Sequence, residues 1–348
     1  MALEVVPLTS IASTVPKADA PVRGSFCCIR ASRHLCLKPR YGEGERGVEV
    51  RYLWVGAPGA PTVIVQGGIS ADRQVCRTEG GSENGWWNAL VGAGKAVDLD
   101  QVRVLSIDWL SAADLGADSV SSEDQADAIA ALLDALHIGS VKTFIGSSYG
   151  AMVGLAFASR HSHRLGRLVA LAGAHRPHPL ATAQRSIQRG ILRLGLENGC
   201  RDAATSLARQ LAMTTYRGSA EFAQRFDGDP TFVDGRYRLP VEDYLEHAGR
   251  KFADDFDPVR YLSLSESIDL HQVNPATVRT PATLIGFASD RLVPLSDLCE
   301  LQRQLGAPAS LEVVESLYGH DGFLKESVAL SPLLRTALAE DTTPTRRL

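Results

Sequence analysis

Residues 141–150 of this chain, Val-Lys-Thr-Phe-Ile-Gly-Ser-Ser-Tyr-Gly, join a short apolar run to the pattern Gly-x-Ser-x-Gly. The run predicts a buried strand, and the serine between glycines predicts a sharp turn from that strand into a helix. Gly146 and Gly150 suit such a turn because they carry no side chain that would clash with the strand or the helix. The turn would expose the hydroxyl of Ser148 above a sheet, where it can act as a nucleophile.

Short β-branched runs alternate along the chain with longer stretches of helical pattern. The stretches 122–137 and 149–160 predict helices, the first with an acidic first turn. Two early segments, 33–39 and 47–55, are expected to form an antiparallel hairpin at a sheet edge. The alternation predicts an α/β fold with a mostly parallel sheet, helices on both faces and an active site at the carboxyl ends of the strands. The other predicted strands are 62–65, 102–107, 168–171, 282–286 and 311–314.

The alternation of strands and helices stops between about residues 177 and 278. This stretch is polar and rich in helical pattern, with predicted helices at 181–197 and 201–214. We expect an insertion without strands that covers the strand ends as a lid. The chain would then consist of a lead-in at 1–30, an α/β core at 31–176 and 279–340, a helical lid at 177–278 and a frayed tail at 341–348.

The composition is that of an ordinary globular protein, with 45% apolar and 22% charged residues in a chain of 348. The formal net charge of -4 gives no basic surface for a nucleic acid, and no segment is apolar over the length of a membrane span. The six cysteines are scattered, with no Cys-x-x-Cys pair, so neither a metal site nor a disulfide framework is expected. Because no export signal precedes the core, the sequence predicts a cytoplasmic protein with reduced thiols.

A serine becomes a strong nucleophile when a base takes its proton and an acid orients that base. His320, which follows the last predicted strand, is the expected base. Asp290 is the expected acid because it ends the strand that follows the insertion, and Asp297 and Asp321 are its rivals. The order serine, aspartate, histidine is that of the α/β-hydrolase fold. The sequence therefore predicts this fold, with Ser148, Asp290 and His320 as its catalytic triad.

Acyl transfer by a serine also needs an oxyanion hole, usually two backbone N–H groups aimed at the developing negative charge. The amide of Tyr149, directly after the nucleophile, is the first expected donor. The second is the amide of Gly68, in the glycine-rich turn after the strand at 62–65. The alternative for that turn is a simple strand end with no catalytic role.

Five stretches outside the triad carry a further signal: Gly85-Trp86-Trp87 with 91–98, Gln188-Arg189, Thr215-Tyr216-Arg217, 244–252 and 319–324. Together with the triad, these stretches resemble the homoserine O-acyltransferase family, α/β-hydrolase-fold enzymes of methionine biosynthesis. The resemblance implies that Ser148 takes an acyl group from acyl-CoA and passes it to the hydroxyl of L-homoserine in a ping-pong cycle, with no other cofactor. It also implies a homodimer formed through the lid helices.

The resemblance also assigns the amino-acid acceptor a cation for its carboxylate and an anion for its ammonium group. Arg189 is the expected partner of the carboxylate, and Asp321 is the expected partner of the ammonium. Trp86 and Trp87 either line the pocket or pack in the core.

The chain departs from the family pattern in three places: the loop 108–114, the pair Gly68-Ile69 and the residues after Ser148. These departures indicate a divergent branch and leave the acyl donor open. We favour succinyl over acetyl, which would make the chain a homoserine O-succinyltransferase. A succinyl group needs a cation for its distal carboxylate, and Arg73 is one candidate.

Three alternative functions use the same residues. A serine hydrolase acting on an ester would have the same triad but would admit water to the acyl-enzyme. An acyltransferase of the same fold acting on L-serine or another small alcohol would differ only in its acceptor. A binding protein without enzymatic activity is the third alternative, and the intact triad argues against it.

Overall fold

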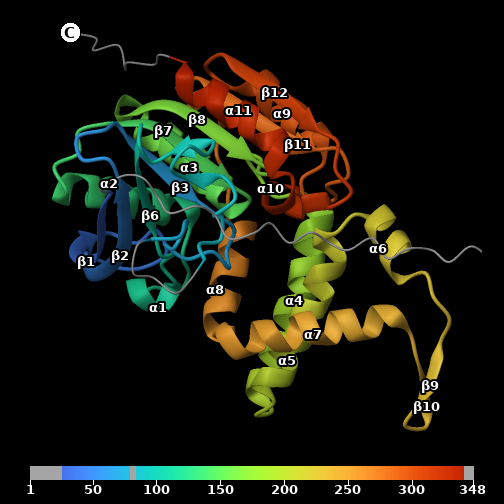
Figure 1. The fold of residues 1–348 in the computed structure, drawn as a ribbon. Helices are drawn as coiled ribbons and strands as arrows, with labels where there is room; N and C mark the ends of the chain where they lie inside the picture. Colours follow the sequence, from blue (N-terminus) through green and yellow to red (C-terminus); the bar gives the residue numbers. More distant parts are fainter. Residues whose placement is uncertain (1–25, 79–83, 341–348) are drawn as a thin grey trace, which may run out of the picture.

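An eight-stranded sheet forms the centre of the computed structural model, which describes residues 26–78 and 84–340 (Figure 1). The strands lie in the order β1-β2-β6-β3-β7-β8-β11-β12. β1 and β2 pair antiparallel at one edge, β2 is antiparallel to β6, and the remaining neighbours are parallel. This confirms the predicted α/β class and the edge hairpin. The strands are Cys27–Leu37 (β1), Arg46–Gly56 (β2), Thr62–Gln66 (β3), Arg103–Ile107 (β6), Val141–Ser147 (β7), Leu165–Leu171 (β8), Ala282–Phe287 (β11) and Ala309–Val314 (β12).

β7, the strand that leads to Ser148, lies inside the sheet rather than at an edge. Its Ile145 pairs with Val65 of β3 on one side and with Val169 of β8 on the other. All three side chains are fully buried. A strand covered on both faces is apolar along its whole length, which explains why the sequence signal at 141–145 is a continuous run.

Helices cover both faces of the sheet and enclose two apolar cores. On one face α2 and α3 pack against the strands, with Phe144 of β7 and Phe157 of α3 in contact at 5.7 Å between ring centroids. On the other face Leu330 and Leu334 of α11 pack in a cluster with Trp87. The core helices are Ala112–Leu115 (α1), Ser122–Ala135 (α2), Tyr149–Arg160 (α3), Leu295–Gln304 (α9), Gly322–Lys325 (α10) and Ser327–Ala339 (α11), with short 3-10 turns at Ser162–Arg164 (η1), Pro275–Thr277 (η2) and Gly319–Asp321 (η3).

The segment between β8 and β11 leaves the main sheet and forms the lid helices, which Figure 1 shows gathered at one end of the molecule. α4 packs along α5, and α5 packs along α7. The two helices expected at 181–197 and 201–214 are present as α4 and α5. The lid helices are Pro179–Glu197 (α4), Arg201–Tyr216 (α5), Ser219–Phe226 (α6), Pro240–Asp255 (α7) and Pro258–Asp269 (α8).

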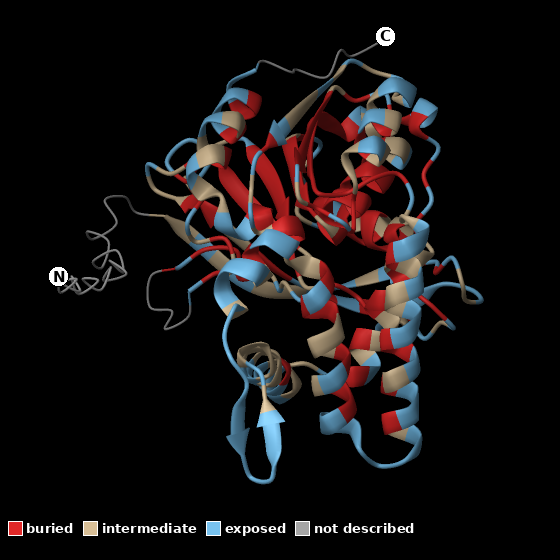
Figure 2. Cartoon of the chain, turned by 90° about the vertical axis from the view of Figure 1, so that its right-hand side faces the viewer, coloured by how far each residue is buried: buried red, intermediate tan, exposed pale blue. Residues whose placement is uncertain are grey.

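The lid also contains a small β-hairpin, so the prediction of an insertion without strands is wrong. β9 (Thr231–Val233) and β10 (Arg236–Arg238) pair antiparallel across Asp234 and Gly235. Both turn residues have positive φ, 51° and 80°, and Asp-Gly is a strong signal for such a two-residue hairpin turn. Figure 2 shows the hairpin as an exposed projection. Because neither strand has a buried face, the chain has no apolar alternation there to reveal them.

The remaining boundaries differ slightly from the predicted ones. β1 begins at Cys27, within the expected lead-in, while residues 1–25 and the expected tail at 341–348 lie outside the described residues. A second small sheet pairs β4 (Val91–Gly92) with β5 (Val97–Asp98). Within 26–78 and 84–340, no helix combines the length and the apolar character needed to cross a membrane.

Candidate active site

Ser148 occupies a strained turn between β7 and α3. Its φ of 55° and ψ of -118° lie in a sparsely populated region, which costs on the order of 1–3 kcal/mol for a residue with a side chain. The turn is held by the Ser148 N–H, which donates to the carbonyl oxygen of Leu171 at 2.8 Å. A Cβ added to Gly146 would lie 2.1 Å from the carbonyl oxygen of Gly150, and one added to Gly150 would lie 2.3 Å from that of Gln66. The close packing of the turn therefore requires both glycines.

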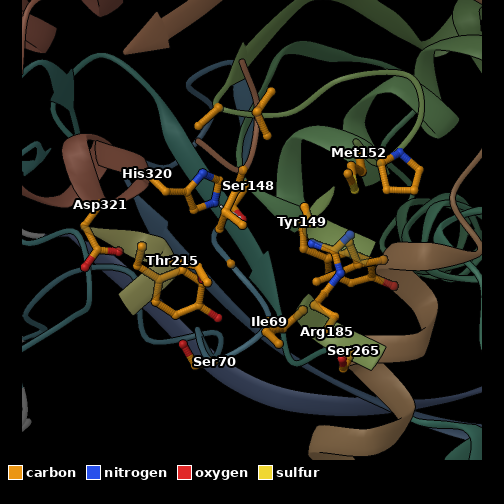
Figure 3. A pocket seen from close by; sticks show the side chains of 18 of the residues that line it. Ile69, Ser70, Ser148, Tyr149, Met152, Arg185, Thr215, Ser265, His320 and Asp321 are labelled. Carbon is orange, nitrogen blue, oxygen red and sulfur yellow. Dashed lines mark hydrogen bonds between the residues drawn. The ribbon is translucent and has the colours of Figure 1, made fainter. Parts of the chain in front are cut away.

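The structure brings the three predicted triad residues into one hydrogen-bonded chain. His320 Nε2 lies 2.8 Å from Ser148 Oγ (Figure 3), and His320 Nδ1 lies 2.8 Å from Asp290 Oδ2. A neutral imidazole that donates from Nδ1 to Asp290 presents an unprotonated Nε2 to the serine hydroxyl. The arrangement is that of a nucleophile, its base and the acid that orients the base.

Asp290 is fixed by its own backbone surroundings. Its Oδ1 accepts hydrogen bonds from the N–H groups of Leu292 at 2.8 Å and Val293 at 3.1 Å, and its side chain has no exposed surface. These bonds leave Oδ2 for the imidazole. In the described part of the chain, neither rival, Asp297 or Asp321, makes a side-chain hydrogen bond to His320.

Two opposing influences set the pKa of His320. Burial lowers it because the imidazolium loses hydration, whereas the charge and hydrogen bond of Asp290 raise it, and the net shift is upward. The histidine is therefore a stronger base than an exposed one, as proton removal from a serine requires.

The loop that carries His320 approaches the lid closely. Gly319 has a φ of 58°, and a Cβ there would lie 2.7 Å from the carbonyl oxygen of Tyr216. The Gly319 N–H donates to Ser289 Oγ at 3.1 Å, and the Tyr216 ring stacks on the imidazole at 6.0 Å between centroids. A glycine before His320 lets the base reach the nucleophile while touching α5.

The two expected oxyanion donors lie beside Ser148. Among the described residues, neither the Tyr149 N–H nor the Gly68 N–H donates a hydrogen bond to another group. A Cβ placed on Gly68 would lie 3.9 Å from Ser148 Oγ, so this turn is next to the nucleophile. The Gly68 carbonyl oxygen is held by the Trp109 Nε1–H at 2.9 Å, which fixes the turn. The geometry is compatible with the predicted oxyanion hole.

A cavity of about 170 Å³ opens beside the triad (Figure 3). The helices α4, α5 and α8 of the lid form one wall, and the turn after β3 and the start of α3 form the opposite wall. Its polar lid residues include Arg185, Gln188, Arg209, Tyr216 and Ser265, and its core residues include Gly68, Ile69, Trp86, Met152 and Asp321.

Arg189 lies outside this cavity, which does not support its predicted contact with a substrate carboxylate. Its Nη1 donates to Asp269 Oδ2 at 2.6 Å and to Ser265 Oγ at 3.1 Å, so the guanidinium is bound between α4 and α8. Arg185, one helical turn earlier, lines the cavity instead. Both arginines pair with Asp269 and share one face of α4, four residues apart, and the sequence does not reveal which of them also reaches the cavity.

Arg209 and Asp321 are two of the charged residues that line the cavity, a cation and an anion near the triad. The Arg209 guanidinium lies over the rings of Tyr216 and Phe252, 5.2 and 4.5 Å from their centroids, and forms no ion pair within the described residues. The Asp321 carboxylate lies 3.1 Å from Arg217 Nε, without the alignment of a hydrogen bond. Arg209 was not among the predicted site residues, although it precedes Tyr216 by two helical turns on the same face of α5.

The pKa of Asp321 is shifted upward. Burial raises it, and the nearby cations Arg217, His320 and Arg209 oppose that shift without cancelling it. A carboxylate in this position gains from a further positive charge in the cavity.

The two tryptophans divide between the readings that the sequence left open. Trp86 lines the cavity, whereas Trp87 is buried and donates from Nε1 to the carbonyl oxygen of Phe323 at 2.8 Å. Arg73, the candidate for a succinyl carboxylate, does not line the cavity. Its guanidinium is paired with Asp108, which also accepts the Arg73 N–H at 2.9 Å.

Comparison with protein families gives a match over residues 61–327 to the family described as alpha/beta hydrolase fold. A homoserine O-succinyltransferase from Xanthomonas campestris is 46% identical, over 95% of this chain and 89% of the relative. An L-serine/homoserine O-acetyltransferase from Streptomyces lavendulae is 30% identical, over 86% of this chain and 94% of the relative.

Solved structures are similar in fold at low sequence identity. The homoserine O-acetyltransferase of Bacillus anthracis superposes with a TM-score of 0.80 at 16% identity, covering 90% of this chain and 99% of that chain. An esterase superposes with a TM-score of 0.79 at 18% identity, covering 90% of this chain and 100% of that chain. The architecture is therefore common to acyltransferases and ester hydrolases, and the residues of the cavity must distinguish the two.

Proposed function

The chain belongs to the homoserine O-acyltransferase family of the α/β-hydrolase fold, and we propose that it transfers an acyl group, succinyl in preference to acetyl, from acyl-CoA to the hydroxyl of L-homoserine. The observation that carries the proposal is the combination of a complete triad with a cation, Arg209, and an anion, Asp321, in one cavity. An esterase needs only the triad. A zwitterionic acceptor needs both charges as well.

In the first half of the cycle, Ser148 Oγ attacks the thioester carbonyl carbon while His320 Nε2 takes the hydroxyl proton. The Tyr149 and Gly68 N–H groups stabilise the oxyanion of the tetrahedral intermediate. When the intermediate collapses, the carbon–sulfur bond breaks and CoA leaves as a thiol with the proton from His320. The product is an acyl ester of Ser148. Acyl-CoA is a co-substrate, and no other cofactor takes part.

In the second half, the hydroxyl of L-homoserine gives its proton to His320 and its oxygen attacks the acyl carbon. The bond from that carbon to Ser148 Oγ then breaks, and His320 returns the proton to the serine. Arg209 binds the homoserine carboxylate, and Asp321 binds its ammonium group. Holding the acceptor at both ends places its hydroxyl at the ester and gives it an advantage over water.

The proposal is tested by measuring thiol release from succinyl-CoA and acetyl-CoA with L-homoserine, with L-serine and with no acceptor. We expect release that depends on L-homoserine, with one O-acylhomoserine formed for each thiol. Rapid release without any acceptor would identify an ester or thioester hydrolase. Equal turnover with L-serine would support the alternative acceptor.

Replacing Arg209 by methionine should raise KM for L-homoserine by about 10- to 100-fold, because a charge-assisted hydrogen bond to the acceptor carboxylate is lost. The burst of thiol released by acylation of Ser148 should not change, since the donor does not use Arg209. Arg201→Met is the matched control, because Arg201 lies on the same helix with 57% of its side chain exposed. An unchanged KM in the Arg209 variant would contradict this assignment.

We also propose that the enzyme is a cytoplasmic homodimer formed through the lid. Leu180, Ile187 and Leu194 of α4 are 50%, 58% and 63% exposed, and their spacing of seven residues places them in one stripe. A second copy would cover this stripe. Sedimentation velocity should give the mass of a dimer for the wild type and of a monomer for the double variant Ile187→Glu, Leu194→Glu. A monomeric wild type would rule the dimer out.

A further inference from the structure

The lid wall of the cavity carries more positive charge than the acceptor needs. Three arginines line the cavity, Arg176, Arg185 and Arg209. Arg176 is 58% exposed and paired with Glu300, and Arg209 is the proposed partner of the homoserine carboxylate. Arg185 is left without a role in the proposed reaction.

Arg185 is held in a fixed orientation by one carboxylate. Its Nε and Nη2 both donate to Asp269 Oδ1, at 2.9 and 2.5 Å. Only 12% of the Arg185 side chain and 9% of the Asp269 side chain are exposed. Nη1 of Arg185 makes no hydrogen bond within the described residues, so one donor of the planar guanidinium remains for a ligand in the cavity.

Asp269 does not neutralise this arginine alone, because it also pairs with Arg189 at 2.6 Å and accepts a hydrogen bond from Thr182 Oγ1 at 2.8 Å. Two guanidinium groups share one carboxylate, which leaves one positive charge in excess. A nearly buried excess charge is costly unless an anion compensates it. An anion in the cavity next to Arg185 would balance the charge of Arg185, Arg189 and Asp269.

Arg185 and Asp321 lie on different sides of the nucleophile. In Figure 3, Asp321 lies beyond His320 on one side of Ser148, whereas Arg185 lies on the other side, near Tyr149 and Ser265. The space in front of Arg185 therefore lies across Ser148 from Asp321, the proposed partner of the acceptor's ammonium group. Arg185 and Ser148 line the same cavity, so an acyl chain attached to Ser148 would share that cavity with Arg185.

We propose that Arg185 binds the distal carboxylate of the acyl group and so selects a succinyl donor, the thioester of a short dicarboxylic acid, over a neutral acyl donor. The inference rests on the proposed acyl transfer to homoserine. Asp269 is the positioning residue that holds the guanidinium in place. The distal carboxylate of the acyl group stays ionised throughout both halves of the cycle, and no bond to Arg185 forms or breaks.

The test compares succinyl-CoA with butyryl-CoA, whose acyl chain also has four carbons but ends in a methyl group. Arg185→Met should lower kcat/KM for succinyl-CoA by about 10- to 100-fold, the effect of losing a hydrogen bond between charged groups. It should leave kcat/KM for butyryl-CoA and KM for L-homoserine close to wild type. Asp269 keeps Arg189 and Thr182 as partners in this variant, so no unpaired carboxylate is created.

Arg193→Met is the matched control, since Arg193 lies two turns later on α4, is 56% exposed and is 3.9 Å from its nearest carboxylate. It should not change the preference between donors. Arg185→Lys retains the charge but lacks the planar fork, so it should recover part of the succinyl activity, and it provides the readout if the methionine variant does not fold.

Three results would overturn the inference. The first is an equal loss with both donors, and the second is a rise in KM for L-homoserine with no change in donor preference. The third is a wild type that transfers butyryl or acetyl to L-homoserine in preference to succinyl, which would refute the succinyl preference but leave acyl transfer to L-homoserine intact. A wild type that transfers no acyl group to L-homoserine would instead refute the proposed function itself.

Discussion

Replacing Ser148 by alanine should abolish acyl transfer, with kcat lower by about 10⁴- to 10⁶-fold. The hydroxyl is the only group placed 2.8 Å from His320 Nε2 among the described residues, and without it no acyl-enzyme can form. The oxyanion donors and the charged cavity remain, so binding of both substrates should persist. The measurement is steady-state thiol release in the presence of saturating L-homoserine.

Ser147→Ala is the control for this substitution. Ser147 precedes the nucleophile and is equally small, but its hydroxyl faces the carbonyl oxygen of Gln66 at 3.5 Å. It should retain activity close to the wild type. A Ser148→Ala enzyme that still transfers acyl groups at the wild-type rate would refute the assignment of the nucleophile.

Replacing Asp290 by asparagine should lower kcat by about 10⁴-fold while preserving the fold. The amide can no longer stabilise the imidazolium, and it can reverse the tautomer that presents Nε2 to Ser148. Asp297→Asn is the control, because Asp297 lines the same cavity without a hydrogen bond to His320. A large loss in the Asp297 variant with little loss in the Asp290 variant would reverse the two assignments.

The same substitution should move the pH profile. His320 accepts a proton only when neutral, so activity is present above its pKa and is lost as the pH falls through that value. Asp290 raises the pKa of His320 above 6.5 against the effect of burial, and the acidic limb of kcat/KM should therefore lie above pH 6.5 in the wild type. In Asp290→Asn the charge of Asp290, the largest influence that raises the pKa of His320, is lost, while burial still lowers that pKa and Asp321 raises it only weakly, so the limb should shift to lower pH. A limb at the same pH in both enzymes would contradict this account of the base.

The sequence was sufficient for the parts of the site that depend on local structure. The turn at Ser148 follows from an apolar strand and two glycines, and the triad follows from residue order along alternating strands and helices. These signals lie within short stretches of chain. The resulting geometry joins Ser148, His320 and Asp290 through hydrogen bonds of 2.8 Å.

The sequence was not sufficient to predict which charged side chains pair with residues far away in the chain. Arg189 and Arg73 were predicted to bind substrate carboxylates, but Arg189 pairs with Asp269 on α8 and Arg73 pairs with Asp108. Arg185 and Arg209 looked like ordinary helix residues, and only the packing of α4 and α5 against the core turns them toward the cavity. Such choices depend on tertiary contacts that helical periodicity does not encode.

Mass spectrometry of the intact enzyme provides the most direct test of the central claim, a Ser148 acyl-enzyme that transfers its acyl group to homoserine. The enzyme is mixed with one equivalent of succinyl-CoA, analysed, and then mixed with L-homoserine. We predict a mass increase of one succinyl group on Ser148 that persists in water and disappears on addition of L-homoserine, with formation of one equivalent of O-succinylhomoserine. Hydrolysis of the succinyl adduct by water as fast as its transfer to L-homoserine would contradict this mechanism. So would a Ser148→Ala enzyme that forms product at the wild-type rate without any adduct.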